Sequence, residues 1–238
     1  MKHLSVYDHT TGKRLAFLQN AFNIGYTLEE NALWTARFSL PYSDPKRKYC
    51  AYFNFVEFWE SDPTTRAERY IGLFRIMPAT ANKMGADDSV TYECEHVLAT
   101  LMDDVLLGWH QIGNIGVYTN QVLAYILSQQ TVKRWTLGDC AFWHQYLYGW
   151  EHENLLAALF SVPAPFTGSY RWEFDTRRTP WTLHLRIPPT TTKAELRYRK
   201  NLRGVEKVID PSNICTRLYA FGYGEGENAL NISKKPCS

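Results

Sequence analysis

Apolar and polar residues alternate in short runs along the first ninety-odd residues, and turn residues separate the runs. In residues 33–40 every second residue from Trp34 to Leu40 is apolar, and polar residues stand between them. A period of two places alternate side chains on opposite faces of a strand. The expected strands are residues 4–7, 14–18, 22–28, 33–40, 53–60, 70–76 and 89–94. Short strands at near-regular spacing, without long helices between them, predict an antiparallel β-barrel over residues 1–96.

The pattern changes to a helical period after residue 96. Apolar residues recur three and four positions apart from Val97 to Val105, which predicts a helix. A second helix is expected from residues 119–120, where a polar side chain can cap it. A third starts near residues 153–154 and ends before Pro163, because proline cannot continue a helix. The apolar faces of the second and third helices contain Val122, Leu123, Ile126, Leu127, Leu155, Leu156, Leu159 and Phe160.

Strand character returns after the third helix. Residues 170–174 and 181–187 alternate, with Trp181 and Ile187 facing inward, and a turn at residues 177–180 joins them. An aromatic cluster between the second and third helices has no clear period: Trp135, Phe142, Trp143, Tyr146, Tyr148 and Trp150. Further extended pieces are expected at residues 195–198, 205–209 and 214–223. The chain is therefore predicted to be mainly β, with an α+β section over residues 97–209.

Composition supports sheet structure and gives no global sign of a charged partner. The chain has 15 Tyr, 12 Phe and 8 Trp, and aromatic residues suit half-buried pleated surfaces. Lys and Arg number 26 against 24 Asp and Glu, which gives a net charge of +2. No run approaches the roughly 18 apolar residues that would span a bilayer, and the N-terminus has no signal-peptide core. We expect no membrane partner and synthesis in the cytoplasm.

The cysteines and the glycine-rich run predict no special chemistry. The five cysteines are scattered, odd in number and never in Cys-x-x-Cys spacing: Cys50, Cys94, Cys140, Cys215 and Cys237. Free thiols are expected, rather than a disulfide framework or a zinc site. Residues 222–226 read Gly-x-Gly-x-Gly, but no helix follows and Glu225 would repel phosphate, so a turn is favoured.

The histidines are the first candidates for a metal or catalytic site. There are seven: His3, His9, His96, His110, His144, His152 and His184. None stands in His-Glu-x-x-His or His-x-His spacing. His144 and His152 are eight residues apart, and Glu151 and Glu153 flank His152, so a metal site there is conceivable. Packing roles are favoured, because histidine so often serves polar packing. No catalytic, cofactor-binding or metal-binding residue is predicted.

Basic residues concentrate near the C-terminus. Seven lie within residues 186–207, opposed by Glu195 and Glu206: Arg186, Lys193, Arg197, Arg199, Lys200, Arg203 and Lys207. Such charge could contact nucleic-acid phosphates. A solvated strand face, or pairing with acidic residues of a neighbouring subunit, explains it equally well.

Four motifs, in this order, resemble the N-terminal region of phage and prophage tail minor structural proteins. They are Phe-Arg-Ile at residues 74–76, a polar-aromatic segment with His at 90–98, a Tyr-x-Lys-Asn-Leu-x-Gly-like turn at 198–204, and Thr-Arg-Leu at 216–218. The family that these motifs resemble is the prophage endopeptidase tail family, which is related to tail-associated lysins. Each motif alone is common, and their order and spacing carry the resemblance.

The resemblance implies a fold similar to the T4-type baseplate hub protein. There, two small β-barrels carry α/β insertions, and three subunits form a ring around the tail channel. Residues 210–238 would supply the first strands of a second barrel. About twenty residues follow Leu218, so this barrel is expected to be incomplete, and its apolar segment 214–223 to be covered by a neighbouring subunit or by further sequence. Gly204 is expected at a turn that requires positive φ.

The resemblance also implies a role for His96 and a set of partners. His96 follows Glu93 and Glu95, and a nearby carboxylate could tune an imidazole for acid-base work. In the family the corresponding side chain joins the barrel to the helix. The implied partners are other copies in a homotrimer, a distal tail protein and a tape measure protein, with non-specific passage of DNA through the channel. The implied location is the virion tail.

The predicted function is therefore a non-enzymatic tail-tip or baseplate hub. Two alternatives belong to other classes. A carbohydrate-binding β-domain would use exposed aromatic residues such as Trp143 and Trp150 as platforms for sugars. A muralytic endopeptidase would cleave cell walls.

Overall fold

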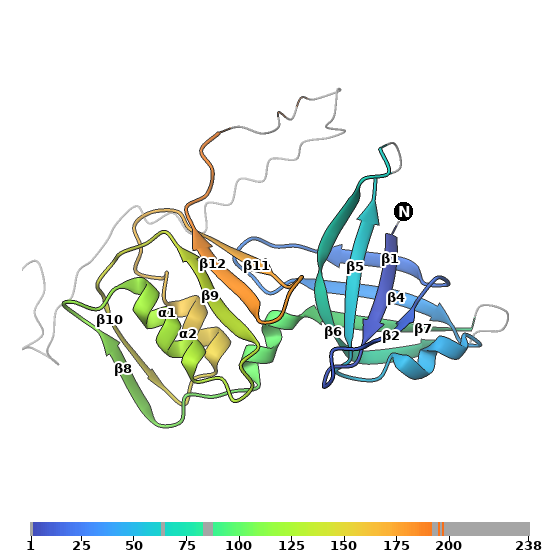
Figure 1. Cartoon of the computed structure of the whole chain (residues 1–238), viewed down its shortest axis with the longest axis horizontal. Helices are drawn as coiled ribbons and strands as arrows, with labels where there is room; N and C mark the ends of the chain where they lie inside the picture. Colours follow the sequence, from blue (N-terminus) through green and yellow to red (C-terminus); the bar gives the residue numbers. More distant parts are fainter. Residues whose placement is uncertain (1, 63–64, 83–87, 192–194, 196, 198–238) are drawn as a thin grey trace, which may run out of the picture. The chain divides into compact units, whose positions relative to one another are not determined.

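The computed structural model describes residues 2–62, 65–82, 88–191, 195 and 197 (Figure 1). The chain splits into two compact units, Met1–Pro189 and Thr190–Ser238. The motifs at residues 198–204 and 216–218 lie outside the described residues, and so do Gly204 and the expected strands at 205–209 and 214–223. Division of the chain into parts 1–96, 97–209 and 210–238 stays a prediction.

Seven antiparallel strands form one sheet in the first half of the larger unit. They are β1 (Lys2–Tyr7), β2 (Arg14–Phe17), β3 (Phe22–Thr27), β4 (Thr35–Pro41), β5 (Phe55–Ser61), β6 (Glu68–Asn82) and β7 (Ser89–His96). Their order is β2-β1-β5-β6-β7-β4-β3, and a 3-10 helix, η1 (Pro45–Tyr49), follows β4. All the strands predicted for this region are present, and the mainly β fold class is confirmed.

The sheet buries one face and curls back on itself. Alternation places Phe38 and Leu40 in the core, where Phe38 packs against Phe58 and stacks on Tyr92. Strand β3, at one end of the sheet, also contacts β1, which lies next to the other end. The Lys2 ammonium of β1 donates a hydrogen bond to the Ile24 carbonyl of β3 (3.1 Å). Pairing between β2 and β3 would close a barrel, and it is not among the pairings of the described residues. Barrel closure stays a prediction.

The rest of the larger unit combines two small sheets with helices (Figure 1). Its elements are η3 (Val97–Met102), β8 (Trp109–Gly113), α1 (Thr119–Ser128), β9 (Trp135–Cys140), β10 (Leu147–Glu151), α2 (Leu155–Ser161), β11 (Arg171–Asp175) and β12 (Trp181–Arg186). Strands β10 and β8 form an antiparallel pair. The second sheet has the order β11-β12-β9, and β12 pairs with β9 in parallel.

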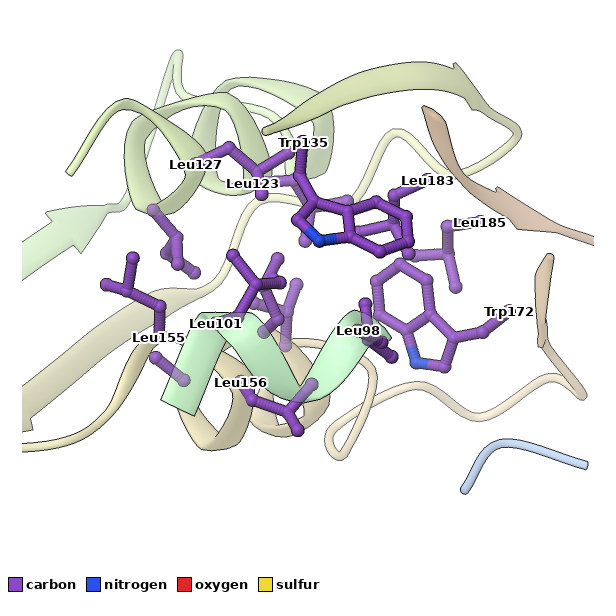
Figure 2. Close-up of a cluster of buried hydrophobic side chains, with 14 of the residues drawn as sticks. Leu98, Leu101, Leu123, Leu127, Trp135, Leu155, Leu156, Trp172, Leu183 and Leu185 are labelled. Atoms are coloured by element: carbon purple, nitrogen blue, oxygen red, sulfur yellow. The ribbon is translucent and has the colours of Figure 1, made fainter. Parts of the chain in front are cut away.

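These elements enclose a second core of large apolar side chains (Figure 2). Helix η3 contributes Leu98 and Leu101, and Trp172 lies on the sheet side of the cluster. From α1, α2 and the sheet come Leu123, Leu127, Leu155, Leu156, Trp135, Leu183 and Leu185. Because burial of apolar area is the main favourable term in folding, this cluster fixes the helices against the sheet.

The two later helices match the prediction, and the first is shorter than predicted. Helix α1 begins at Thr119, and α2 is capped by the Asn154 side chain, which accepts from the Ala157 amide (2.9 Å). The first helix is a 3-10 helix that ends at Met102, and Val105 is exposed. It ends there because Asp103 turns its carboxylate towards Arg75 (2.6 Å).

The aromatic cluster that had no clear period forms two of the strands. Trp135 starts β9, and Tyr148 and Trp150 lie on the buried face of β10. Both strands are short, and β10 has only two buried residues, so their periodicity could not be recognised. Strand β8, which pairs with β10, was also missed.

Gly113 is a position where the structure requires glycine. Its φ is +117°, and an added Cβ would lie 1.9 Å from the Tyr146 carbonyl oxygen. Gly113→Ala should therefore lower the free energy of unfolding by about 2 kcal/mol, since strained backbone alone costs about 1–3 kcal/mol. Gly116 is the matched control, because it has φ +86° and open space around its Cβ position. Urea unfolding should show a smaller loss for Gly116→Ala, and equal losses would contradict the steric explanation.

Candidate functional site

The junction between the large sheet and the α+β section is built around His96. This residue ends β7 and precedes η3, and its Nδ1 accepts a hydrogen bond from the Leu98 amide (3.3 Å). Four aromatic rings surround the imidazole with centroids 5.0–6.2 Å away: Trp34, Phe74, Trp135 and Phe174. These rings come from both sides of the junction, so His96 joins the two parts, as the resemblance implies.

Burial keeps the His96 imidazole neutral. Desolvation lowers its pKa from 6.5 to about 3, because a low-dielectric environment disfavours the charged form. Since Nδ1 accepts a hydrogen bond, the proton lies on Nε2, which is buried and has no hydrogen-bond partner among the described residues. The neighbouring Glu95 pairs with Arg75, so acid-base tuning of His96 by this carboxylate has no geometric support.

Arg75 forms the main charged connection of the junction. Its guanidinium is almost fully buried and donates two bonds to one oxygen of Glu95, at 2.9 and 2.6 Å. A third bond reaches Asp103, just after η3, at 2.6 Å. The sequence did not reveal this connection, because Arg75 and Glu95 stand in two separate motifs and no local pattern pairs them with each other or with Asp103. A buried arginine must be paired to offset its desolvation, so these bonds hold β6, β7 and η3 in one geometry.

Three further hydrogen bonds join the parts of this unit. The Asn31 side chain donates to the Tyr170 carbonyl (3.0 Å) and accepts from the Trp172 amide (2.9 Å). It thereby occupies the outer edge of β11 as a neighbouring strand would. The Tyr70 hydroxyl bonds to the Thr176 hydroxyl (2.7 Å), and burial raises the pKa of Tyr70. The large sheet and the α+β section are thus connected at several points.

The candidate metal pair does not come together. His144 packs among Phe142, Tyr146 and Phe166. His152 lies in the turn after β10 with φ +53°. Within the described ranges no three His, Cys, Asp or Glu residues are grouped as a metal site would require. The expectation that the chain has no catalytic or metal-binding residue stays a prediction.

The aromatic residues considered as sugar platforms have different environments. Trp150 is buried and donates its Nε1 proton to the Ser161 hydroxyl (2.9 Å), so it cannot stack on a sugar. Trp143 is 65% exposed and packs edge-on against Tyr118. Of the two candidates, Trp143 alone keeps a geometry suited to a carbohydrate.

The described members of the basic segment are already paired. Arg186 bonds to Asp139 (2.5 Å) and lies 3.5 Å from Glu173, and Arg197 pairs with Glu195 (2.8 Å). Lys193, Arg199, Lys200, Arg203 and Lys207 lie outside the described residues. In the described part of the segment, both arginines are paired with nearby carboxylates. This favours a strand face with locally balanced charge over a surface that contacts nucleic acid.

An open cleft of about 550 Å³ beside β11 and β12 is lined by three arginines, Arg69, Arg177 and Arg186, and two carboxylates. Arg177 pairs with Asp175 (2.7 Å), and this guanidinium lowers the pKa of the carboxyl to about 2. Arg186 and Glu173 face the same cleft. Two of the three arginines of the cleft are therefore paired with carboxylates.

Part of the chain matches a known protein family. Residues 104–178, from the residues after η3 to the turn after β11, match the family described as "Prophage endopeptidase tail domain". No curated protein sequence matches the chain. The described helices of this unit are also too short or too polar to cross a membrane.

Solved structures show the same fold. Prophage tail protein gp18 from Listeria monocytogenes is similar, with a TM-score of 0.55 and 13% identity over 84% of this chain and 56% of that chain. The Francisella PdpA-VgrG complex is similar, with a TM-score of 0.50 and 7% identity over 94% of this chain and 34% of that chain. A tail protein from Neisseria meningitidis has a TM-score of 0.48 and 12% identity, over 77% of this chain and 50% of that chain.

These likenesses, at 13% identity or less, show a shared fold. The chain spans a little over half the length of the Listeria protein. The resemblance to prophage tail proteins predicted from the sequence is confirmed. Residues 104–178 thus match the prophage endopeptidase tail domain, in a chain whose fold is similar to that of a prophage tail protein.

Proposed function

We propose that this chain is a non-enzymatic part of a phage or prophage tail-tip hub. The observation that carries the proposal is the family match over residues 104–178 in a chain with the fold of a prophage tail protein. The chemistry of the described residues agrees with it, because the most buried ionisable groups have structural partners or are kept neutral. Arg75 is held by two carboxylates, and His96 is enclosed by aromatic rings.

In this proposal several copies form a ring at the end of the tail tube. A part of such a ring must hold its shape under load, and the junction of Arg75, His96 and Asn31 supplies that rigidity. The ring is taken to be trimeric, with a distal tail protein and a tape measure protein as neighbours and DNA passing through without sequence recognition. Head-to-tail contacts between identical copies form a ring when the rotation between successive copies closes.

A cell-wall clearing assay tests the non-enzymatic part of this proposal. The purified chain should leave peptidoglycan embedded in a gel intact, while a muralytic enzyme at the same concentration clears it. Clearing by this chain would show that it is an enzyme. An assay with a variant of the exposed Trp143 separates the remaining alternative: glycan-array binding that disappears in Trp143→Ala would indicate a carbohydrate-binding domain instead.

A further inference from the structure

Among the described residues, strand β9 is an edge of the three-stranded sheet, with no strand paired on its outer side. It pairs with β12 on one side, and the Trp181 amide donates to the Arg134 carbonyl (2.7 Å). In a parallel ladder, backbone groups of alternate residues face the partner strand. The backbone groups of residues 134 and 136 therefore face β12, and those of 135 and 137 face the open edge.

One end of this edge is closed by a side chain, and the middle is free. Gln130 accepts a hydrogen bond from the Trp135 amide (2.9 Å) and donates one to the Trp135 carbonyl (2.8 Å). The Leu137 amide and carbonyl have no such partner in the described part of the chain. These two groups form one donor and acceptor pair, oriented like the backbone groups of an edge strand that can pair with a further strand.

A groove of about 460 Å³ runs along the same edge, between α1 and β9. Three consecutive β9 residues, 135–137, line it. Because successive side chains of a strand point to opposite faces, this lining shows that the groove follows the edge of the strand. None of its eight lining residues is charged, and they are Asn120, Gln121, Ala124, Leu127, Ser128, Trp135, Thr136 and Leu137.

Asn120 adds a second, independent observation. Its side-chain oxygen is buried and has no hydrogen-bond partner within the described residues. A buried acceptor without a donor is costly. The groove thus combines a buried unused acceptor, a backbone donor and acceptor at Leu137 that lack partners among the described residues, and uncharged walls of mixed polarity. An extended, uncharged peptide segment satisfies all of these features.

Among the edge strands of this chain, β8 fits the groove best. It contains no Asp, Glu, Lys or Arg, and it belongs to a two-stranded sheet whose outer side is unpaired. Its Trp109 is 64% exposed, and the neighbouring Leu147 of β10 is 57% exposed. The other edges fit less well: β2 carries Arg14, β3 has a carbonyl bound by Lys2, β10 carries Glu151, and the edge of β11 is occupied by Asn31.

We propose that β8 of a second copy of this chain adds to the free edge of β9, in the groove beside α1. The proposal rests on the ring described above, and it names the surfaces through which successive copies meet. The two surfaces differ, so the contact is head-to-tail, which generates rings when the rotation closes. The contact would also cover the exposed apolar residues of the β8–β10 sheet. Exposed apolar patches often mark contacts between proteins.

Light scattering on the full chain and on lysine variants tests this contact. Thr136→Lys places a charge in the groove, and Gln111→Lys places one on β8. Thr167→Lys is the matched control, since Thr167 is also exposed and lies in neither surface. At a concentration where the wild type is oligomeric, both test variants should fall to the single-chain mass of 27.6 kDa, and the control should keep the wild-type mass. Circular dichroism confirms that the variants are folded.

Each other outcome has a definite meaning. If both test variants remain oligomeric, the β8–β9 contact is wrong, while the ring itself still stands. If Thr136→Lys dissociates and Gln111→Lys does not, the groove accepts a different segment, and the proposed partner strand is wrong. If the wild type has the single-chain mass at every concentration, the ring and this contact both fail.

Discussion

Replacement of Arg75 by methionine is expected to lower the free energy of unfolding by about 3–5 kcal/mol, because loss of one partner from a buried ion pair leaves the other charge uncompensated. Glu95 would keep its charge with only 16% of its side chain exposed. It would also lose both hydrogen bonds from the guanidinium. Urea unfolding, monitored by circular dichroism, measures the change.

Arg177→Met is the matched control for this experiment. Arg177 pairs with Asp175 at 2.7 Å, but 63% of its side chain is exposed, and exposed pairs contribute little to stability because water screens them. A double variant, Arg75→Met with Glu95→Met, should recover much of the loss, because it removes the stranded charge as well. If Arg75→Met costs no more than Arg177→Met, the junction does not depend on the buried ion pair.

Acid should destabilise the protein through His96, at pH values where most carboxylates are still ionised. The pKa of His96 is lowered from 6.5 to about 3 in the folded state. Below pH 6.5 the unfolded chain binds a proton that the folded chain does not, so stability is complete above pH 6.5 and falls as the pH falls towards 3. The slope is about 1.4 kcal/mol per pH unit. At pH 5 the loss should be about 2 kcal/mol relative to pH 7.

A variant without the imidazole isolates this contribution. His96→Phe keeps a ring among the surrounding aromatic side chains, although it loses the acceptor for the Leu98 amide. Its unfolding free energy at pH 7 and at pH 5 should differ by about 2 kcal/mol less than in the wild type. The pKa of Asp175 is lowered to about 2, so its contribution to the unfolding free energy is lost mainly at pH values below this range. Equal pH dependence in the two proteins would show that His96 is not kept neutral by burial.

The strands and helices that follow a clear period could be predicted from the sequence. In β4 and β12, apolar side chains at every second position are buried on one face, so a local pattern reports the packing. Helices α1 and α2 follow their apolar spacing in the same way. Strands β8, β9 and β10 were missed because each is only five or six residues long and contains a glycine, which leaves too few apolar positions to show a period.

The junction could be predicted only in part. His96 was recognised at the end of the barrel region because a known family has a histidine there. Its neighbours Arg75 and Asn31 were missed, because their partners lie 20 to 141 residues away and are brought close by the fold alone. The free edge of β9 is likewise a property of strand order, and no stretch of sequence encodes strand order locally.

The ring is the central claim, and electron microscopy of the purified chain tests it most directly. Particles stained at a concentration where light scattering shows oligomers should average to closed rings with a central opening and three-fold symmetry. Particles of single-chain size at every concentration, or compact oligomers without an opening, would contradict the proposal that this chain forms the hub of a tail tip.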